Sequence, residues 1–266
     1  MKSHILNLLP KGHPWAEHIN YYPSAGSTND LAKALAQQGA PQGTVCIAGS
    51  QTGGRGRRDR SFHSPEGQGL YFSLILRPNC PAKELMHLTC AVAVAACDAV
   101  EALCQKRPQV KWINDLVAGN KKLGGILTEL SVDPKTGLVN YAIIGIGINC
   151  LQKAGDFPAP LQNIATSIQD AYGKSVSPAG LAAGLITSLH GLSGSLLTGK
   201  DAIMSLYKRD CMTLQKQVRI VRGDNEFFAT TVDIDPDGGL IVKLSDGSLT
   251  TVSSGEVSVR GMYGYL

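Results

Sequence analysis

The alternation of apolar and polar stretches predicts a chain of strands and helices. Nearly continuous apolar runs, typical of buried strands, occupy residues 43–49, 69–78 and 138–150. Residues 82–103 are rich in alanine and valine and predict a long helix that packs against a sheet. Residues 110–130 read as two short strands joined by a turn at "AGNK". The pattern therefore favours a sheet covered by helices.

Capping and breaking residues mark the other helices. The segment "STNDLAKALAQQGAP" predicts a helix that Ser27 or Thr28 caps, and that Gly39 and Pro41 end. Two or three further helices are expected between residues 163 and 210, where several glycines make the middle one hard to define.

The pattern changes after Leu214. The segments "QVRIV", "FFATTVDID", "LIVKLSD" and "SLTTVSSGEVSV" each predict a short strand, and turn sequences separate them. Short strands with tight turns are typical of a small β-barrel. We therefore expect two domains, residues 1–213 and residues 214–266.

Composition limits the classes of function. The chain has 266 residues, 43% of them hydrophobic and 17% charged, with a net charge of +4. The pI of 8.6 lies below the value of about 9 that marks many nucleic-acid-binding domains. The N-terminal apolar run is too short for a signal peptide, and the long apolar runs elsewhere are too short or too charged to cross a bilayer. We expect a soluble protein without a membrane partner.

Cysteine and histidine usage predicts a reduced compartment and no structural metal. The seven cysteines are an odd number and form no Cys-x-x-Cys pair. Three of them recur at seven-residue spacing in residues 90–104, which suits the buried face of a helix. This usage favours the cytoplasm. The six histidines form none of the common zinc-binding patterns.

The segment "GGRGRRDR", residues 53–60, concentrates arginine and glycine. Taken alone it has three interpretations: a basic arm for nucleic acid, a solvated charged loop, or a loop that holds a phosphorylated ligand. Glycine amides approach phosphate oxygens closely, and arginines supply bidentate donors. No Walker phosphate-binding sequence occurs in the chain.

Other polar segments favour the ligand interpretation, although each is weak by itself. They are "GSTND", "VKWINDL", "KKLGGIL" and "GIGIN". Together with the arginine loop they supply glycine amides, guanidinium groups and a mobile lysine for one anion. Such a site stabilises a transition state in which negative charge grows.

These segments, with "QTGGRGRR" and "GLYFSLILRP", resemble the bacterial biotin–protein ligases in order and spacing over residues 20–150, and the C-terminal segment resembles the family's small β-barrel. The resemblance implies an α+β fold: a class II synthetase-like core, with a mixed sheet flanked by helices, followed by a small SH3-like β-barrel. It also implies a reaction in two steps. Biotin and ATP, accompanied by Mg²⁺, form biotinyl-5'-AMP. A lysine of a biotin carboxyl carrier protein then takes the biotinyl group.

The same resemblance assigns roles to individual residues. Three are implied to be catalytic: Lys122, Arg57 and Asp115. Contacts to biotin or biotinyl-AMP are implied for Ser27, Thr28, Asn29, Gln51, Gly54, Arg55, Gly56, Arg57, Lys122 and Gly125. Nucleotide contacts are implied for Arg57, Arg60, Phe62, Gly147 and Asn149. No protein-bound metal is expected, because Mg²⁺ arrives with ATP.

The sequence departs from the family pattern at three positions. Asp59 stands where the loop usually has glycine, and it lowers the local positive charge. Phe62 replaces a common tryptophan, which weakens the expected stacking on adenine. Ile113 replaces the usual proline and is expected to relax that turn. These changes bear on rate and affinity more than on the chemistry.

The segment before "STN" is too short for the N-terminal helix-turn-helix of the longer family members, so no DNA binding is expected. A homodimer through sheet edges is compatible with the resemblance. Three alternatives remain open: attachment of lipoate or octanoate, a nucleic-acid-binding module, and a degenerate ligase that binds biotin without turnover. The first is the nearest alternative, because those enzymes also acylate a carrier lysine.

Overall fold

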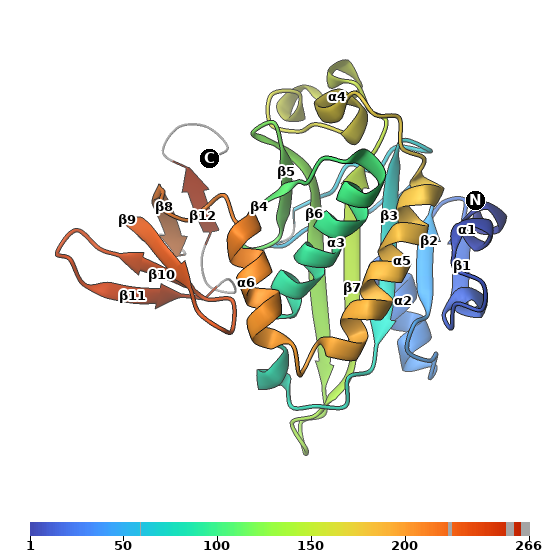
Figure 1. Ribbon diagram of the computed structural model, residues 1–266, viewed down its shortest axis with the longest axis horizontal. Helices are drawn as coiled ribbons and strands as arrows, with labels where there is room; N and C mark the ends of the chain where they lie inside the picture. The colour runs from blue at the N-terminus through green and yellow to red at the C-terminus, as the bar shows by residue number, and fades with distance from the viewer. Residues whose placement is uncertain (59, 223–224, 254–257, 262–266) are drawn as a thin grey trace.

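The chain forms two β-sheets with helices around the first (Figure 1). The computed structural model describes residues 1–58, 60–222, 225–253 and 258–261. The first sheet has seven strands in the order β1-β2-β3-β7-β6-β5-β4. Its strands are β1 (Ile19–Tyr22), β2 (Val45–Ala48), β3 (Gly69–Leu76), β4 (Gln109–Lys111), β5 (Asp115–Ala118), β6 (Lys121–Val132) and β7 (Val139–Asn149).

The first sheet is mixed, as the resemblance implied. β1 pairs with β2 in parallel, and the remaining neighbours pair antiparallel. The helices are α1 (Lys2–Leu8), α2 (Thr28–Gln37), α3 (Leu88–Cys104), α4 (Ile168–Tyr172), α5 (Pro178–Ser195) and α6 (Lys200–Asp210). Short 3₁₀ turns lie at Ala16–His18, Ala82–Leu85, Ala154–Asp156 and Ala159–Leu161. The expected strands and helices are therefore present, and α1 and β1 are elements that the sequence analysis did not anticipate.

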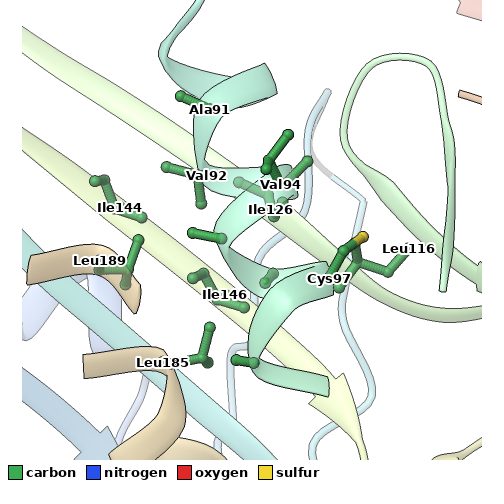
Figure 2. Packing of buried hydrophobic residues seen from close by; sticks show 14 of the residues in the cluster. Ala91, Val92, Val94, Cys97, Leu116, Ile126, Ile144, Ile146, Leu185 and Leu189 are labelled. Carbon is green, nitrogen blue, oxygen red and sulfur yellow. The ribbon is translucent and has the colours of Figure 1, made fainter. Parts of the chain in front are cut away.

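The two faces of the first sheet carry different helices. α3 and α5 cover one face, where Ile126, Ile144 and Ile146 point at them (Figure 2). Side chains alternate along a strand, so Ile143 faces the other way and packs with Ala32 of α2 in a separate small cluster. α2 covers only part of that second face, where it contacts β2, β3 and β7.

The expected long helix is a core element. The stretch Ala82–Cys104, which includes the 3₁₀ turn at Ala82–Leu85 and α3, is long and apolar enough for a membrane span by length and composition, the one such stretch among the described residues. However, 72% of its most apolar window is buried inside the structure. Cys90, Cys97 and Cys104 are all buried with free thiols. The helix therefore packs as the core helix of a soluble protein does.

The second sheet has five strands in the order β11-β10-β9-β8-β12. They are β8 (Gln217–Arg222), β9 (Asn225–Ile234), β10 (Leu240–Lys243), β11 (Leu249–Val252) and β12 (Ser258–Gly261). One expectation was wrong here: "SLTTVSSGEVSV" is not a single strand. Its first part forms β11 and its last part begins β12, and these strands occupy opposite edges of the sheet.

The second sheet docks beside the β4–β5 turn of the first. The Trp112 indole Nε1 donates a 2.9 Å hydrogen bond to the Gly238 carbonyl oxygen. Two ion pairs join α6 to the second sheet, Lys208–Asp233 at 2.8 Å and Lys200–Asp237 at 2.5 Å. The turn that carries "KWIND" is thus held by both sheets.

His87, at the N-cap of α3, is a buried titratable group. Its side chain is fully buried, and Nε2 lies 2.9 Å from the Leu196 carbonyl oxygen. A carbonyl only accepts, so Nε2 carries the proton, and Nδ1 has no hydrogen-bond partner among the described residues. Burial lowers the pKa of His87, although the bond to Leu196 opposes the shift and Lys200 and Asp237 also act on it.

We therefore predict that acid destabilises the fold through His87. Its folded pKa lies below the unfolded value of about 6.5, so the unfolded chain binds more protons. The contribution of neutral His87 to the free energy of unfolding is fully present above about pH 6.5, and it is lost as the pH falls below the unfolded pKa. Urea unfolding should be measured between pH 7.5 and pH 5. The free energy of unfolding should fall less steeply with decreasing pH in His87→Gln than in wild type. The exposed His4→Gln is the control, and equal slopes in all three proteins would contradict the prediction.

Candidate active site

A cavity of about 580 Å³ opens on the second face of the first sheet. Gly145 and Gly147 of β7 lie in its floor, on the side opposite Ile144 and Ile146. A Cβ atom at Gly145 would collide with the Asn29 amide, and one at Gly147 would stand 2.6 Å from the Phe62 ring. The bare backbone of β7 therefore lets α2 and the loop between β2 and β3 approach the sheet closely.

One end of the cavity is lined by uncharged polar groups. Ser27, Thr28 and Asn29 are each 4% exposed and stand at the start of α2. The Gln51 Oε1 accepts hydrogen bonds from the Thr28 backbone N–H at 2.9 Å and from the Thr28 hydroxyl at 3.2 Å. The Ser73 hydroxyl lies 2.6 Å from the Asn29 Oδ1. Such groups suit an uncharged ring that both donates and accepts hydrogen bonds.

The start of α2 is capped in a different way from the one expected. Ser27 occupies the N-cap position, but its side chain makes no capping hydrogen bond. The Gln51 side chain accepts from the Thr28 backbone N–H instead. A residue beyond β2 therefore satisfies the first amide of the helix, and Ser27 and Thr28 keep their side chains on the cavity wall.

The arginine–glycine loop folds back on itself over the cavity. Arg55 forms an antiparallel bridge with Ser61, and the Gly56 N–H donates to the Arg60 carbonyl at 2.7 Å. Most of the loop lines the cavity, a placement that is compatible with the third interpretation, a loop that holds a ligand. Gly54 is the one predicted site residue that does not line the cavity. Its Cα packs so tightly that a Cβ would lie 2.5 Å from the Phe62 carbonyl oxygen.

Arg57 reaches inward from this loop. Its Nη1 donates a 3.2 Å hydrogen bond to the Asn114 Oδ1, and the Asn114 Nδ2 donates to the Ile126 carbonyl at 2.9 Å. Burial and the neighbouring Arg58 lower the pKa of Arg57, while Asp115 raises it. A guanidinium nevertheless stays charged in proteins. Arg57 is therefore a partly desolvated cation fixed above the sheet.

Lys122 and Asp115 face each other across the β5–β6 hairpin. The Lys122 Nζ donates to the Asp115 Oδ1 at 2.5 Å. Gly125 pairs with Asp115 in the sheet, and a Cβ atom there would be in ordinary van der Waals contact, at 3.5 Å, with each of the two side chains. The turn at "AGNK" sets the hairpin register, and the register brings this lysine and this carboxylate together.

The cavity is strongly cationic. Among the described residues that line it, the cations are Arg55, Arg57, Arg58, Arg60, Lys111 and Lys122, and Asp115 is the single carboxylate. This imbalance suits a ligand with several negative charges, such as a nucleotide with its phosphates. The anionic part of a ligand therefore belongs near the loop and the β5–β6 hairpin, and its neutral part belongs near the start of α2.

Some predicted residues have polar groups that already hold protein partners. The Arg55 guanidinium contacts Asp30 at 2.7 Å and Glu129 at 3.3 Å. The Asn149 Nδ2 donates to the Thr166 carbonyl at 2.9 Å, and its Oδ1 accepts from Gln152 at 3.3 Å. These contacts fix neighbouring segments of the chain, which is a structural role beside the expected ligand role.

Phe62 lies on the cavity wall, with its ring edge-to-face with Tyr71 at 6.4 Å. Arg60 also lines the cavity. Phe62 is one of the three departures from the family pattern, and Ile113 is another. Ile113 is buried, and its carbonyl accepts a 3.1 Å hydrogen bond from the Tyr207 hydroxyl. Its peptide bond to Trp112 is cis. Asp59 lies outside the described residues.

One wall of the cavity escaped the sequence analysis. It is apolar and comes from the segment after β7, through Phe157, Leu161, Ile164 and Ala165. This segment is held by Lys122, whose backbone N–H donates to the Ile164 carbonyl at 2.7 Å and whose carbonyl accepts from Thr166 at 2.9 Å. No short motif marks the segment. Lys111 and Asn114 were also missed, although both stand inside "VKWINDL".

Two family models match the chain. The Biotin/lipoate A/B protein ligase family matches residues 21–149, which contain the first sheet except its first two residues and most of the cavity lining. The Biotin protein ligase C terminal domain matches residues 213–260, which contain the second sheet except its last residue.

Individual proteins similar to this chain agree with the family models. The Bifunctional ligase/repressor BirA of Bacillus spizizenii is 35% identical over 232 residues, which are 87% of this chain and 71% of that protein. The biotin–[acetyl-CoA-carboxylase] ligase of Mycobacterium tuberculosis is 27% identical over 94% of this chain and 91% of its own length. The structure of biotin protein ligase from Aquifex aeolicus in complex with biotin and ATP superposes with a TM-score of 0.75 at 26% identity. The superposition covers 92% of this chain and 99% of the Aquifex aeolicus chain. The chain therefore belongs to the biotin protein ligase family.

Proposed function

We propose that this chain is an ATP-dependent biotin–protein ligase. It forms biotinyl-5'-AMP and transfers the biotinyl group to the ε-amine of a lysine on a biotin carboxyl carrier protein, such as that of acetyl-CoA carboxylase. The names of its relatives describe this activity, and the similar Aquifex aeolicus structure holds biotin and ATP. We also propose that residues 1–213 form the catalytic domain, that residues 214–266 form the barrel, and that the protein works in the cytoplasm.

The division of the cavity into a neutral end and a cationic end carries this proposal. The ureido ring of biotin is uncharged and both donates and accepts hydrogen bonds, which matches Thr28, Asn29 and Gln51. The carboxylate of biotin and the phosphates of ATP are anions, which match Arg57 and Lys122. Lipoate offers a disulfide ring without these donors, and it would leave the buried polar groups of the neutral end unpaired.

In the first step a carboxylate oxygen of biotin attacks the α-phosphorus of ATP. The bond from that phosphorus to the bridging oxygen breaks, and pyrophosphate leaves. Both reactants are anions, so Lys122 and Arg57 lower their repulsion and stabilise the charge that collects on the α-phosphate oxygens. A single lining carboxylate suits Mg²⁺ that keeps phosphate and water ligands; there it would neutralise phosphate charge beside Asp115.

In the second step the amine of the carrier lysine attacks the carbonyl carbon of the mixed anhydride. The bond from that carbon to the phosphate oxygen breaks, and AMP leaves. We propose that Asp115 orients the incoming amine and accepts its proton. The 2.5 Å contact with Lys122 supports this role, because it holds the carboxylate beside the lysine that we assign to the α-phosphate. Lys122 in turn stays beside the phosphate oxygen that departs with AMP.

One prediction from the proposed function concerns Lys122. Biotin-dependent ATP–pyrophosphate exchange should be readily measured with the wild-type protein, and lipoate should not replace biotin. Lys122→Ala should lower kcat/KM for the exchange by about 10²–10³, the usual effect of losing one preorganised charge-stabilising donor.

Lys121→Ala is the matched control, because this adjacent lysine donates to the Gln162 carbonyl instead of lining the cavity. It should exchange nearly as fast as the wild type. No exchange with either acid from a folded wild-type protein would refute the ligase proposal. Exchange supported equally by lipoate would refute the assignment of the neutral end to biotin.

The second prediction concerns Arg57, which closes the inner side of the loop. Arg57→Gly removes the contact to Asn114 and one cation above the adenylate, so biotinyl-AMP should escape before transfer. Asn114→Ala should give a milder form of the same defect, because it removes the anchor of Arg57 and the bond to the Ile126 carbonyl but keeps the cation. The measurement is labelling of a mixture of proteins that lack a carrier domain. Labelling as selective as that of wild type in the glycine variant would contradict the prediction.

A further inference from the structure

Arg55 lines the cavity, and its guanidinium group pairs with two carboxylates at the outer side of the loop. It stands next to Gly54 at the base of the loop, where it bridges with Ser61. Its Nη2 donates to the Asp30 Oδ1 at 2.7 Å and to the Glu129 Oε2 at 3.3 Å. Neither carboxylate lines the cavity. The base of the loop is therefore tied to α2 and to β6 by one guanidinium group.

The same carboxylate connects this tie to the neutral end of the cavity. The Glu129 Oε2 also accepts a 2.7 Å hydrogen bond from the Asn29 Nδ2, and the Asn29 Oδ1 accepts from Ser73. One oxygen atom thus receives a donor from the loop and a donor from the wall that faces the neutral ring. Asn29 and Arg55 therefore share one acceptor, which couples the neutral end of the cavity to the base of the loop.

We propose that Arg55 is a positioning residue: with Asp30 and Glu129 it forms an ion-pair latch that holds the base of the ligand loop shut. It acts through these carboxylates and does not bind the phosphates or biotin through its guanidinium. Arg57 fastens the inner side of the loop on Asn114, and Arg55 fastens the outer side. The inference deepens the proposed function, since the retained ligand is the adenylate of that reaction.

The exposure of the latch fits a contact that opens in each catalytic cycle. The side chains of Arg55 and Asp30 are 42% and 60% exposed, and that of Glu129 is 31% exposed. Exposed ion pairs are weak and are screened by salt. Such a pair biases the loop toward the closed state without trapping product, whereas a buried pair would resist opening.

The first test needs no enzyme activity. Trypsin cuts after arginine, and the loop contains Arg57, Arg58 and Arg60. Asp30→Asn and Glu129→Gln should each raise the rate of cutting within the loop by about two- to fivefold at low salt, the range expected of exposed ion pairs. Added salt should raise the wild-type rate toward that of the variants, because it screens the latch. Mass spectrometry of the fragments identifies the cut positions.

Asp201→Asn is the matched control. Asp30 and Asp201 are both acidic residues in the first turn of a helix, α2 and α6 respectively, so both substitutions weaken the interaction with the helix dipole equally. Only Asp30 contacts the loop. Asp201→Asn should therefore be cut within the loop at the wild-type rate.

The second test measures escape of the adenylate. Protein loaded with biotinyl-AMP is diluted, and free adenylate is followed with time. Asp30→Asn should raise the escape rate and the KM for biotin by about two- to fivefold, with a smaller change in the rate of exchange at saturating biotin. Arg55→Gln should do the same, and Asp30→Asn combined with Arg55→Gln should add little to Arg55→Gln alone.

Two outcomes would overturn the latch. One is an Asp30→Asn variant that behaves like Asp201→Asn in both tests while Arg55→Gln loses biotin binding, since Arg55 would then contact the ligand directly. The other is full additivity of the two substitutions. A wild-type protein that makes no adenylate would instead refute the proposed function, and the trypsin test would still decide whether the latch exists.

Discussion

The cavity depends on the close approach of two elements to the bare backbone of β7. Glycine at positions 145 and 147 lets the Asn29 amide and the Phe62 ring rest directly on the strand. Asn29 lies in the first turn of α2 and Phe62 follows the arginine loop, so the two glycines fix how far both elements stand from the sheet. A side chain at either position would push the helix or the loop away, and the polar groups of Thr28, Asn29 and Arg57 would no longer converge.

The charges in the site follow from the same arrangement. The loop places its arginines over the sheet, and the β5–β6 hairpin of the sheet itself contributes Lys122 to the cavity lining. Four arginines and two lysines share this space with a single carboxylate among the described lining residues. Repulsion among them would hold the loop open, but contacts with other side chains of the protein oppose it. Arg55 pairs with Asp30 and Glu129, and Arg57 donates a hydrogen bond to Asn114.

The second sheet contributes to the site indirectly. The turn that carries Asn114 and Asp115 contacts it through Trp112 and Gly238, and Tyr207 of α6 binds the carbonyl of Ile113 in the same turn. A hydrogen-bonded turn is rigid enough to keep Asp115 within reach of Lys122. This explains in physical terms why a small β-module packs beside a catalytic sheet without lining its cavity among the described residues.

The sequence by itself determined the local elements and the chemistry that they carry. Apolar runs marked β2, β3, β7 and α3, the "AGNK" turn marked the hairpin, and the glycine–arginine loop indicated an anion. Tertiary structure decided which groups meet. Gln51, which follows β2, caps α2; Arg55 pairs with two carboxylates that lie outside the cavity lining; and Phe157 and Ile164 build a wall from a segment without a motif. These contacts join residues far apart in the chain, and sequence periodicity reports only on neighbours within one helix or strand.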